Sequence, residues 1–145
     1  MRRIVTALLL LCAVCACGFA SSTPQDPVEK AREHAAHASL KKQAKADVEL
    51  VRALVDRAGE LYTAQKFDES AKAIDEAGTV LAAARASAEQ HKHDIKQCDL
   101  ILDPVERRLK DYSNSFATQD RPRVLALLKQ VQAMRDELLK MLFET

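Results

Sequence analysis

The sequence predicts an all-α protein: an elongated antiparallel three-helix bundle, built of helical hairpins with coiled-coil-like packing around a long central helix. Three Gly and four Pro in 145 residues are few, as expected for long helices joined by few turns. Aromatic residues make up 4% and much of the apolar content is alanine, which does not suit a β-sandwich or barrel. Over residues 67–116, mostly apolar or small residues recur in alternating steps of three and four, which is the spacing of a seam between packed helices. At seven-residue intervals this seam holds Phe67, Ile74, Leu81, Ala88, Ile95, Leu102, Leu109 and Phe116.

Residues 1–20 have the features of a signal peptide. Arg2 and Arg3 precede an apolar run over residues 4–16, which is too short to cross a bilayer comfortably. A small-x-small pattern at residues 18–20 offers a secretory cleavage site. The small residue before Cys17 alternatively resembles a bacterial lipobox, in which Cys17 is lipidated and becomes the new N-terminus. A retained N-terminal anchor helix is the third reading, and export to the periplasm or the envelope is the expectation.

Charge and cysteine content argue against an intrachain disulfide in the mature chain and against a nucleic-acid partner. Cys98 is the one cysteine beyond the leader, so the mature chain is expected to hold no intrachain disulfide. The chain has 22 Lys and Arg against 21 Asp and Glu; loss of Arg2 and Arg3 leaves 20 against 21, a formal net charge of −1. Acids and bases alternate along the chain, so we expect no nucleic-acid partner, and membrane contact only through the signal peptide or a lipid anchor.

Residues 21–26 form a polar spacer, and the helical domain is expected over residues 27–145. Its first helix is expected over residues 27–64, with Asp26 as N-cap and Pro27 at the first helical position. The first half of this segment is rich in Ala, Lys and His and is weakly apolar. The second half carries a broad apolar stripe that predicts packing on a partner helix: Leu50, Val51, Leu54, Val55, Ala58, Leu61 and Tyr62.

A turn is expected over residues 65–68, with Phe67 packing beside an Asp68 N-cap. Residues 54–77 around this turn carry packing and turn residues of one tetratricopeptide motif: Ala58, Leu61, Tyr62, Phe67, Asp68, Glu69, Ile74 and Ala77. The segment therefore resembles a single tetratricopeptide repeat, which implies an antiparallel helical hairpin. The motif's early Trp and turn Gly are missing, and no second copy follows at that period. A generic hairpin with similar residues is the alternative.

The second helix is expected over residues 68–113. Asp103, Pro104 and Glu106 could start a fresh helix, yet the seam runs through Leu102, Val105 and Leu109 without a change of phase. We therefore expect one helix kinked near residues 99–103, along which both outer helices pack.

The third helix is expected over residues 122–143. Its apolar face is the strongest in the chain, and Leu125 and Leu139 widen it. A face of this width indicates contact with two neighbours, or a dimer surface at the C-terminal end of the helix.

One set of residues could bind a metal. Folding residues 27–64 against residues 68–113 about the turn at Lys66 places two histidines level with a second group of ligand types. The candidate metal site comprises His34, His37, His91, Asp94 and Cys98. Imidazole, carboxylate and thiolate are ligands for Zn²⁺ or Cu, and helical bundles build such sites from facing helices.

The sequence carries no catalytic signature: no glycine-rich phosphate loop, no Ser-His-Asp pattern and no Cys-His nucleophile pattern. No catalytic residue or cofactor is expected. The favoured reading is an exported, non-enzymatic protein-interaction or structural module of the cell envelope, which binds a protein partner or itself. The alternatives are a periplasmic metal-binding protein that uses the five residues above, and a holdase-like periplasmic chaperone.

Overall fold

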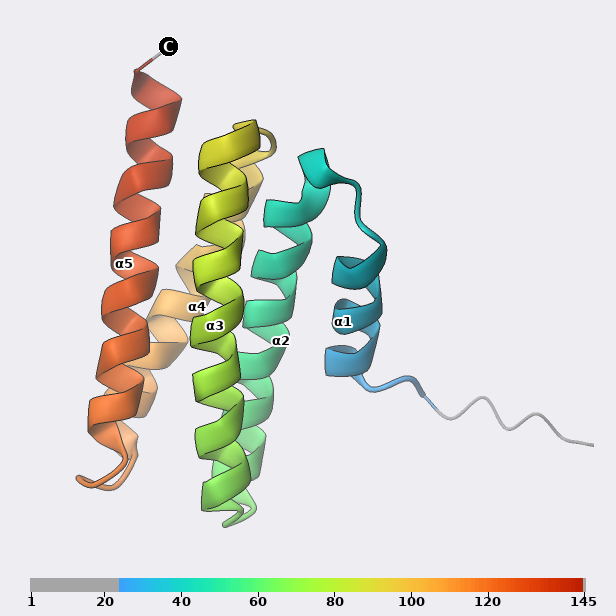
Figure 1. Cartoon of the computed structure of the whole chain (residues 1–145). Coiled ribbons are helices and arrows are strands. Elements are labelled where there is room, and N and C mark those ends of the chain that lie inside the picture. Colours follow the sequence, from blue (N-terminus) through green and yellow to red (C-terminus); the bar gives the residue numbers. More distant parts are fainter. Residues whose placement is uncertain (1–23, 145) are drawn as a thin grey trace, which may run out of the picture.

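A computed structural model describes residues 24–144, and within them the chain is helical throughout, with short connections (Figure 1). The predicted signal peptide over residues 1–20 and the candidate lipidation site Cys17 lie outside the described residues. The elements are α1 (Pro27–His37), the 3₁₀ turn η1 (Leu40–Lys42), α2 (Gln43–Thr63), α3 (Phe67–His91), α4 (Ile95–Ser115) and α5 (Arg121–Phe143). The predicted all-α class, with helices packed as antiparallel hairpins, is confirmed.

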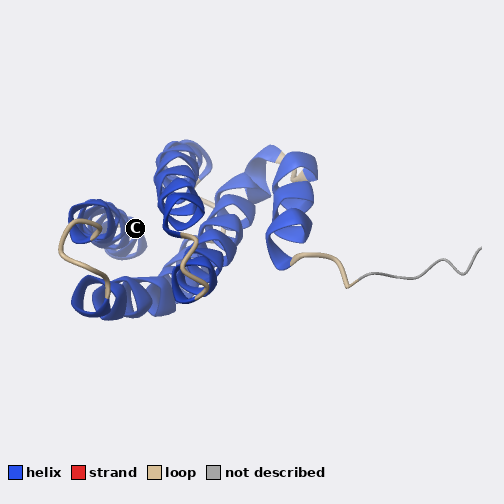
Figure 2. Ribbon diagram, turned by 90° about the horizontal axis from the view of Figure 1, so that it is seen from below, coloured by secondary structure: helices blue, strands red, loops and turns tan. Residues whose placement is uncertain are grey.

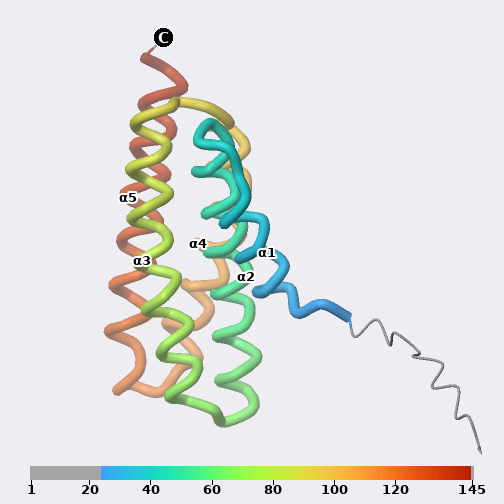
Figure 3. The backbone as a smooth tube through the Cα atoms, turned by 45° about the vertical axis from the view of Figure 1, so that its right-hand side comes forward, coloured from blue at the N-terminus to red at the C-terminus, as the bar shows by residue number. Residues whose placement is uncertain are grey.

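Two helical hairpins lie side by side and form the body of the molecule (Figures 1 and 2). The first hairpin is α2 with α3, and the second is α4 with α5. Helix α2 packs beside α4, and α3 packs beside α5. The first helices of the two hairpins are therefore neighbours, as are the second helices, and each neighbouring pair runs in the same direction. The shorter α1 packs on α2, on the side away from α4 and α5 (Figure 3). The hairpin expected around residues 54–77 is therefore observed, with its turn at residues 64–66.

The long central helix expected over residues 68–113 is two helices. The chain reverses direction at residues 92–94, between α3 and α4, where Lys92 and Asp94 take left-handed backbone conformations with φ of 45° and 55°. Pro104 neither breaks nor starts a helix, because it lies inside α4 with its ring exposed. The central helix with two outer helices is thus replaced by two stacked hairpins.

The first helix expected over residues 27–64 is also divided. Ala38 and Ser39 are extended, and η1 turns the chain so that α1 folds back on α2. The Gln43 side chain fixes this bend, because its amide donates to the Ala35 carbonyl at 2.9 Å and to the Asp47 carboxylate at 2.8 Å. The predicted N-cap is confirmed: the Asp26 carboxylate accepts a 2.9 Å hydrogen bond from the Val28 amide.

The core runs along the length of both hairpins. Seven of the eight seam residues are buried; the exception is Phe67, which is 47% exposed. They meet apolar residues from α2 and α5, whose largest fully buried side chains are Val48, Val51, Val55, Val124, Val131, Met134 and Leu138. Buried apolar area of this kind is the main stabilising contribution in a helical bundle.

Aromatic rings join the two hairpins at the end that carries both hairpin turns. The ring of Phe116 stacks on Tyr62 at a centroid distance of 3.6 Å and on Tyr112 at 4.8 Å. The Tyr62 hydroxyl donates to the Asp120 carboxylate at 2.9 Å and accepts from the Ala117 amide at 2.7 Å. Because Tyr62 lies in the last turn of α2 and its partners Phe116, Ala117 and Asp120 lie in the α4–α5 turn, these contacts hold the two hairpins together.

Candidate functional site

A groove runs along the two parallel helices α3 and α5. Three adjoining pockets of about 310, 590 and 570 Å³ form it, and each shares residues with the next. Ile74 and Arg123 line both the first and the second pocket, and Gly78, Ala126 and Gln130 line both the second and the third. The groove therefore extends from the hairpin turns past the middle of both helices.

Short side chains open this groove, and the core forms its floor. Gly78 and Ala82 of α3 face Ala126 and Ala133 of α5 across it, and none of the four fills the space between the helices. The floor is apolar, because the lining residues Leu81, Leu127 and Met134 are almost fully buried in the core. A helix that binds a groove of this kind contributes apolar side chains at helical spacing.

Two interhelical ion pairs border the groove. Arg123 Nε lies 3.0 Å from the Asp75 carboxylate, and Arg85 pairs with Glu137 further along. The second carboxylate oxygen of Glu137 is buried and accepts no hydrogen bond from any residue between 24 and 144. A buried acceptor without a donor is costly to the stability of the fold.

The end of the groove beside the hairpin turns is a pocket with aromatic walls. It is lined by Tyr62, Phe67 and Phe116 together with Ile74 and Val124. Phe67 meets Tyr62 edge-on at a centroid distance of 4.8 Å and leaves nearly half of its own surface exposed. The pocket is of a size to accept one large apolar side chain.

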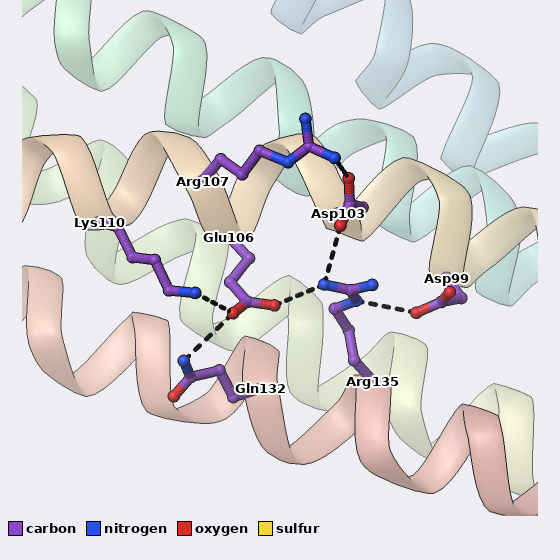
Figure 4. Close-up of polar contacts among 7 residues, drawn as sticks. All are labelled: Asp99, Asp103, Glu106, Arg107, Lys110, Gln132 and Arg135. Carbon is purple, nitrogen blue, oxygen red and sulfur yellow. Dashed lines mark hydrogen bonds and ion pairs between the residues drawn. The ribbon is translucent and has the colours of Figure 1, made fainter.

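On the opposite side of α5, a network of charged residues fastens α5 to α4 (Figure 4). The Arg135 guanidinium contacts the carboxylates of Asp99, Asp103 and Glu106 at 2.8, 3.1 and 2.6 Å. Glu106 also accepts from Lys110 at 2.7 Å and from Gln132 at 3.2 Å.

Within this network, burial raises the pKa of Glu106, but hydrogen bonds from Lys110, Arg135 and Gln132 outweigh burial and hold that pKa at about 2. Hydrogen bonds to Asp99 and Glu106 raise the pKa of the Arg135 guanidinium above its ordinary value, although burial opposes them. The charges of the network satisfy one another, so its role is to hold the second hairpin closed.

The residues of the predicted metal site do not form a coordination group. His34 and His37 lie exposed on α1, and His34 Nε2 is 3.8 Å from a Glu49 carboxylate oxygen on α2. Cys98 is fully buried in α4. Among the residues that the structure describes, no three His, Cys, Asp or Glu side chains are placed to hold a metal ion. The register that predicted the site fails because the chain folds back at both residues 38–42 and residues 92–94.

The remaining two candidate ligands lie at the reversal. His91 is the last residue of α3, and Asp94 directly precedes α4. The Asp94 carboxylate pairs with His93, whose Nδ1 lies 3.1 Å away, and not with His91. Burial, and secondly the nearby Asp94 charge, raise the pKa of the Cys98 thiol to about 11. The thiol is therefore protonated at neutral pH, and thiolate is the form that binds metals.

Comparison with known proteins adds no relative. No protein-family model, no curated protein and no solved structure matches the chain. Within residues 24–144, no helix is long and apolar enough to cross a membrane.

The groove differs in position from the surfaces that the sequence indicated. The sequence pointed to the wide apolar face of residues 122–143. The alternating steps of three and four from Phe67 also include Ala77, Ala84 and Ala88, and these three alanines are buried in the core, as the seam predicts. Gly78, Ala82, Ala126 and Ala133 were missed; their one sequence signal is that small residues recur on the flank of each apolar face.

Proposed function

We propose that this protein is a non-enzymatic interaction module of the cell envelope, which binds an amphipathic helix of a protein partner in the groove between α3 and α5. The observation that carries the proposal is the continuity of the groove. Three pockets that share residues line one valley between two parallel helices, over an apolar floor. Location in the envelope rests on the leader-like sequence of residues 1–20.

The shape and chemistry of the groove favour a helical partner. Gly78, Ala82, Ala126 and Ala133 leave room for a third helix to approach both walls closely. An apolar side chain of that helix would enter the aromatic pocket at Phe67.

Site-specific photo-crosslinking in the cells that express the chain tests this proposal. A photoreactive amino acid replaces Ala82 or Ala126 in the groove and, as the matched control, the exposed Ala36 on α1. The expected result is one adduct of constant mass from both groove positions and none from Ala36. An Ala133→Arg substitution, which fills the groove, is expected to reduce the yield of that adduct at least about tenfold.

Two controls show whether a lower adduct yield comes from the filled groove and not from unfolding or from an added arginine. Circular dichroism must show that Ala133→Arg retains its helical content, which is expected because Ala133 is exposed. A variant with arginine at the exposed Ala36 must leave the adduct in place. Equal crosslinking from the groove and from α1, or an adduct that survives Ala133→Arg, would overturn the proposal.

A further inference from the structure

A second surface lies on the outward side of α5, bordered by Lys129, which also lines the groove, and by Gln132, which also donates to Glu106 of α4. Six residues spaced alternately by four and three line it, and all six are exposed: Leu125, Lys129, Gln132, Asp136, Leu139 and Phe143. This 3-4 spacing is that of a coiled-coil seam, yet no helix of the described chain covers it. We call these six residues the outer seam of α5.

The ends of the outer seam are apolar. Leu125 is 49% exposed near the start of α5, and Leu139 and Phe143 are 38% and 82% exposed near its end. The C-terminal end of α5 extends past the end of α3 (Figure 1), and Phe143 is the last residue of α5. Large apolar side chains at both ends of one seam are characteristic of a surface that packs on another helix.

The middle of the outer seam carries two opposite charges. Lys129 and Asp136 form no ion pair or hydrogen bond with any residue in the range 24–144. Three other charged residues of α5 are paired: Arg123 with Asp75, Arg135 with the α4 carboxylates, and Glu137 with Arg85. Lys140, which lies outside the outer seam, has no such side-chain partner within the described chain either, so the outer seam holds two of the three unpaired charges of α5, and these two have opposite sign.

The outer seams of two copies are complementary when the two α5 helices run antiparallel, but not when they run parallel. In an antiparallel pair of α5 helices centred on Met134, Leu125 lies opposite Phe143 of the second copy. Lys129 then lies opposite Leu139 and beside Asp136 of the second copy, so each opposite charge finds a partner, twice per pair. A parallel pair would instead place Lys129 against Lys129 and Asp136 against Asp136, which is repulsive.

We propose that the occupant of the outer seam is a second copy of this chain, packed antiparallel along α5 about a two-fold axis that passes between Gln132 and Asp136, at the level of Met134 along the helix. An isologous contact of this kind closes on itself and yields a dimer rather than a filament. Of the six outer-seam residues, Lys129 also lines a pocket of the α3–α5 groove and the other five do not, so the dimer borders the groove without filling it. This inference goes beyond the proposed function and does not depend on it.

Sedimentation equilibrium of the protein, purified as the cell processes it, tests the proposal. The expected wild-type species is a dimer. Either Lys129→Asp or Asp136→Lys alone is expected to weaken the dimer about tenfold or more, because each places like charges together at two symmetric positions. The combined swap of both residues is expected to restore the dissociation constant to within about threefold, because it rebuilds both pairs with reversed sign.

Two further variants complete the experiment. Phe143→Ser is expected to dissociate the dimer while leaving the helical content unchanged, because Phe143 makes little contact with the core. Lys72→Asp, which alters an exposed lysine of α3, is expected to leave the dimer intact. Asp136 does not line the groove, so a loss of dimer in Asp136→Lys tests the dimer proposal independently of partner binding in the groove. A wild-type monomer at about 100 μM, or a double swap no tighter than the single variants, would overturn the inference.

Discussion

The hydroxyl oxygen of Tyr112 on α4 lies 2.1 Å from the point that a Cβ atom would occupy at Gly59 on α2. The tyrosine is held there because its hydroxyl donates a 3.0 Å hydrogen bond to the Val55 carbonyl and its ring stacks on Phe116. Gly59 therefore allows α2 and α4 to approach closely where the two hairpins meet.

Gly59→Ala is expected to lower the free energy of unfolding by about 1–3 kcal/mol, because overpacking outweighs the better helix propensity of alanine. Urea unfolding followed by circular dichroism measures the change. Gly78→Ala on α3 is the matched control, since its Cβ would meet its nearest neighbour, Gln130 Oε1, at an ordinary 3.4 Å. That variant is expected to gain up to about 1 kcal/mol. Similar gains from both substitutions would show that Tyr112 moves aside at no cost.

Acid is expected to weaken the α4–α5 network through Glu106. Its pKa of about 2 in the folded protein lies below the ordinary value of 4.5, so ionised Glu106 stabilises the fold above pH 4.5. This contribution is lost as the pH falls from 4.5 towards 2. Glu106→Gln is expected to cost about 1–2 kcal/mol at neutral pH and much less at about pH 3.

Urea unfolding at several pH values measures the Glu106 effect. Glu69→Gln, which removes an exposed carboxylate from the first turn of α3, is the control and is expected to show a smaller and flatter difference. A Glu106→Gln cost that stays constant between neutral pH and about pH 3 would rule out this linkage.

The reversal between α3 and α4 is expected to tolerate glycine better than the native lysine. Lys92 has φ 45° and ψ 35°, a left-handed conformation that costs energy for any residue with a Cβ atom. Lys92→Gly is expected to raise the free energy of unfolding by about 0.5–1 kcal/mol. Gln90→Gly, two residues earlier inside α3, is expected to lower it by about 1 kcal/mol. Thermal melts of the two variants should therefore shift in opposite directions.

Cys98 is expected to resist thiol reagents in the folded protein. Its thiol is fully buried, and its pKa of about 11 keeps it protonated at about pH 8. Mass spectrometry of the tryptic peptide over residues 97–107, after treatment with iodoacetamide, should detect labelling only when urea is present. Rapid labelling without urea would mean that α4 opens readily at its N-terminal end.

The apolar seam could be predicted from the sequence, but the path of the chain could not. Ile74, Leu81, Ile95, Leu102 and Leu109 are buried as the 3-4 spacing predicts. The spacing continues through residues 92–94 because α3 and α4 both turn their seam residues to the same core, so the reversal leaves no change of phase. The left-handed positions there are occupied by Lys92 and Asp94, and no glycine marks the turn.

The strongest sequence signal for a helix boundary in this region, at Asp103 and Pro104, does not mark a boundary. Asp103 and Pro104 have the sequence features of a helix start, yet Pro104 lies near the middle of α4 with its ring towards solvent. Packing of the residues on both sides of it, including Leu102 and Val105, outweighs the hydrogen bond that proline cannot donate. Tertiary contacts here override local propensity.

The groove could not be derived from the sequence because it depends on that reversal. Helices α3 and α5 become parallel neighbours only when α4 runs back between their ends. A single long helix over residues 68–113 would have placed Gly78 and Ala126 far apart. The outer seam of α5 was closer to prediction, because Leu125 and Leu139 already widened the apolar face in the sequence.

The ring stack at the hairpin turns makes one end of the molecule optically distinct. The chain has two tyrosines and no tryptophan, and both tyrosines, Tyr62 and Tyr112, belong to this stack. Tyrosine fluorescence and the tyrosine bands of near-ultraviolet circular dichroism thus report on this junction alone, while far-ultraviolet circular dichroism reports on every helix. If the hairpins separated before they melted, the two signals would change at different denaturant concentrations, with no label attached.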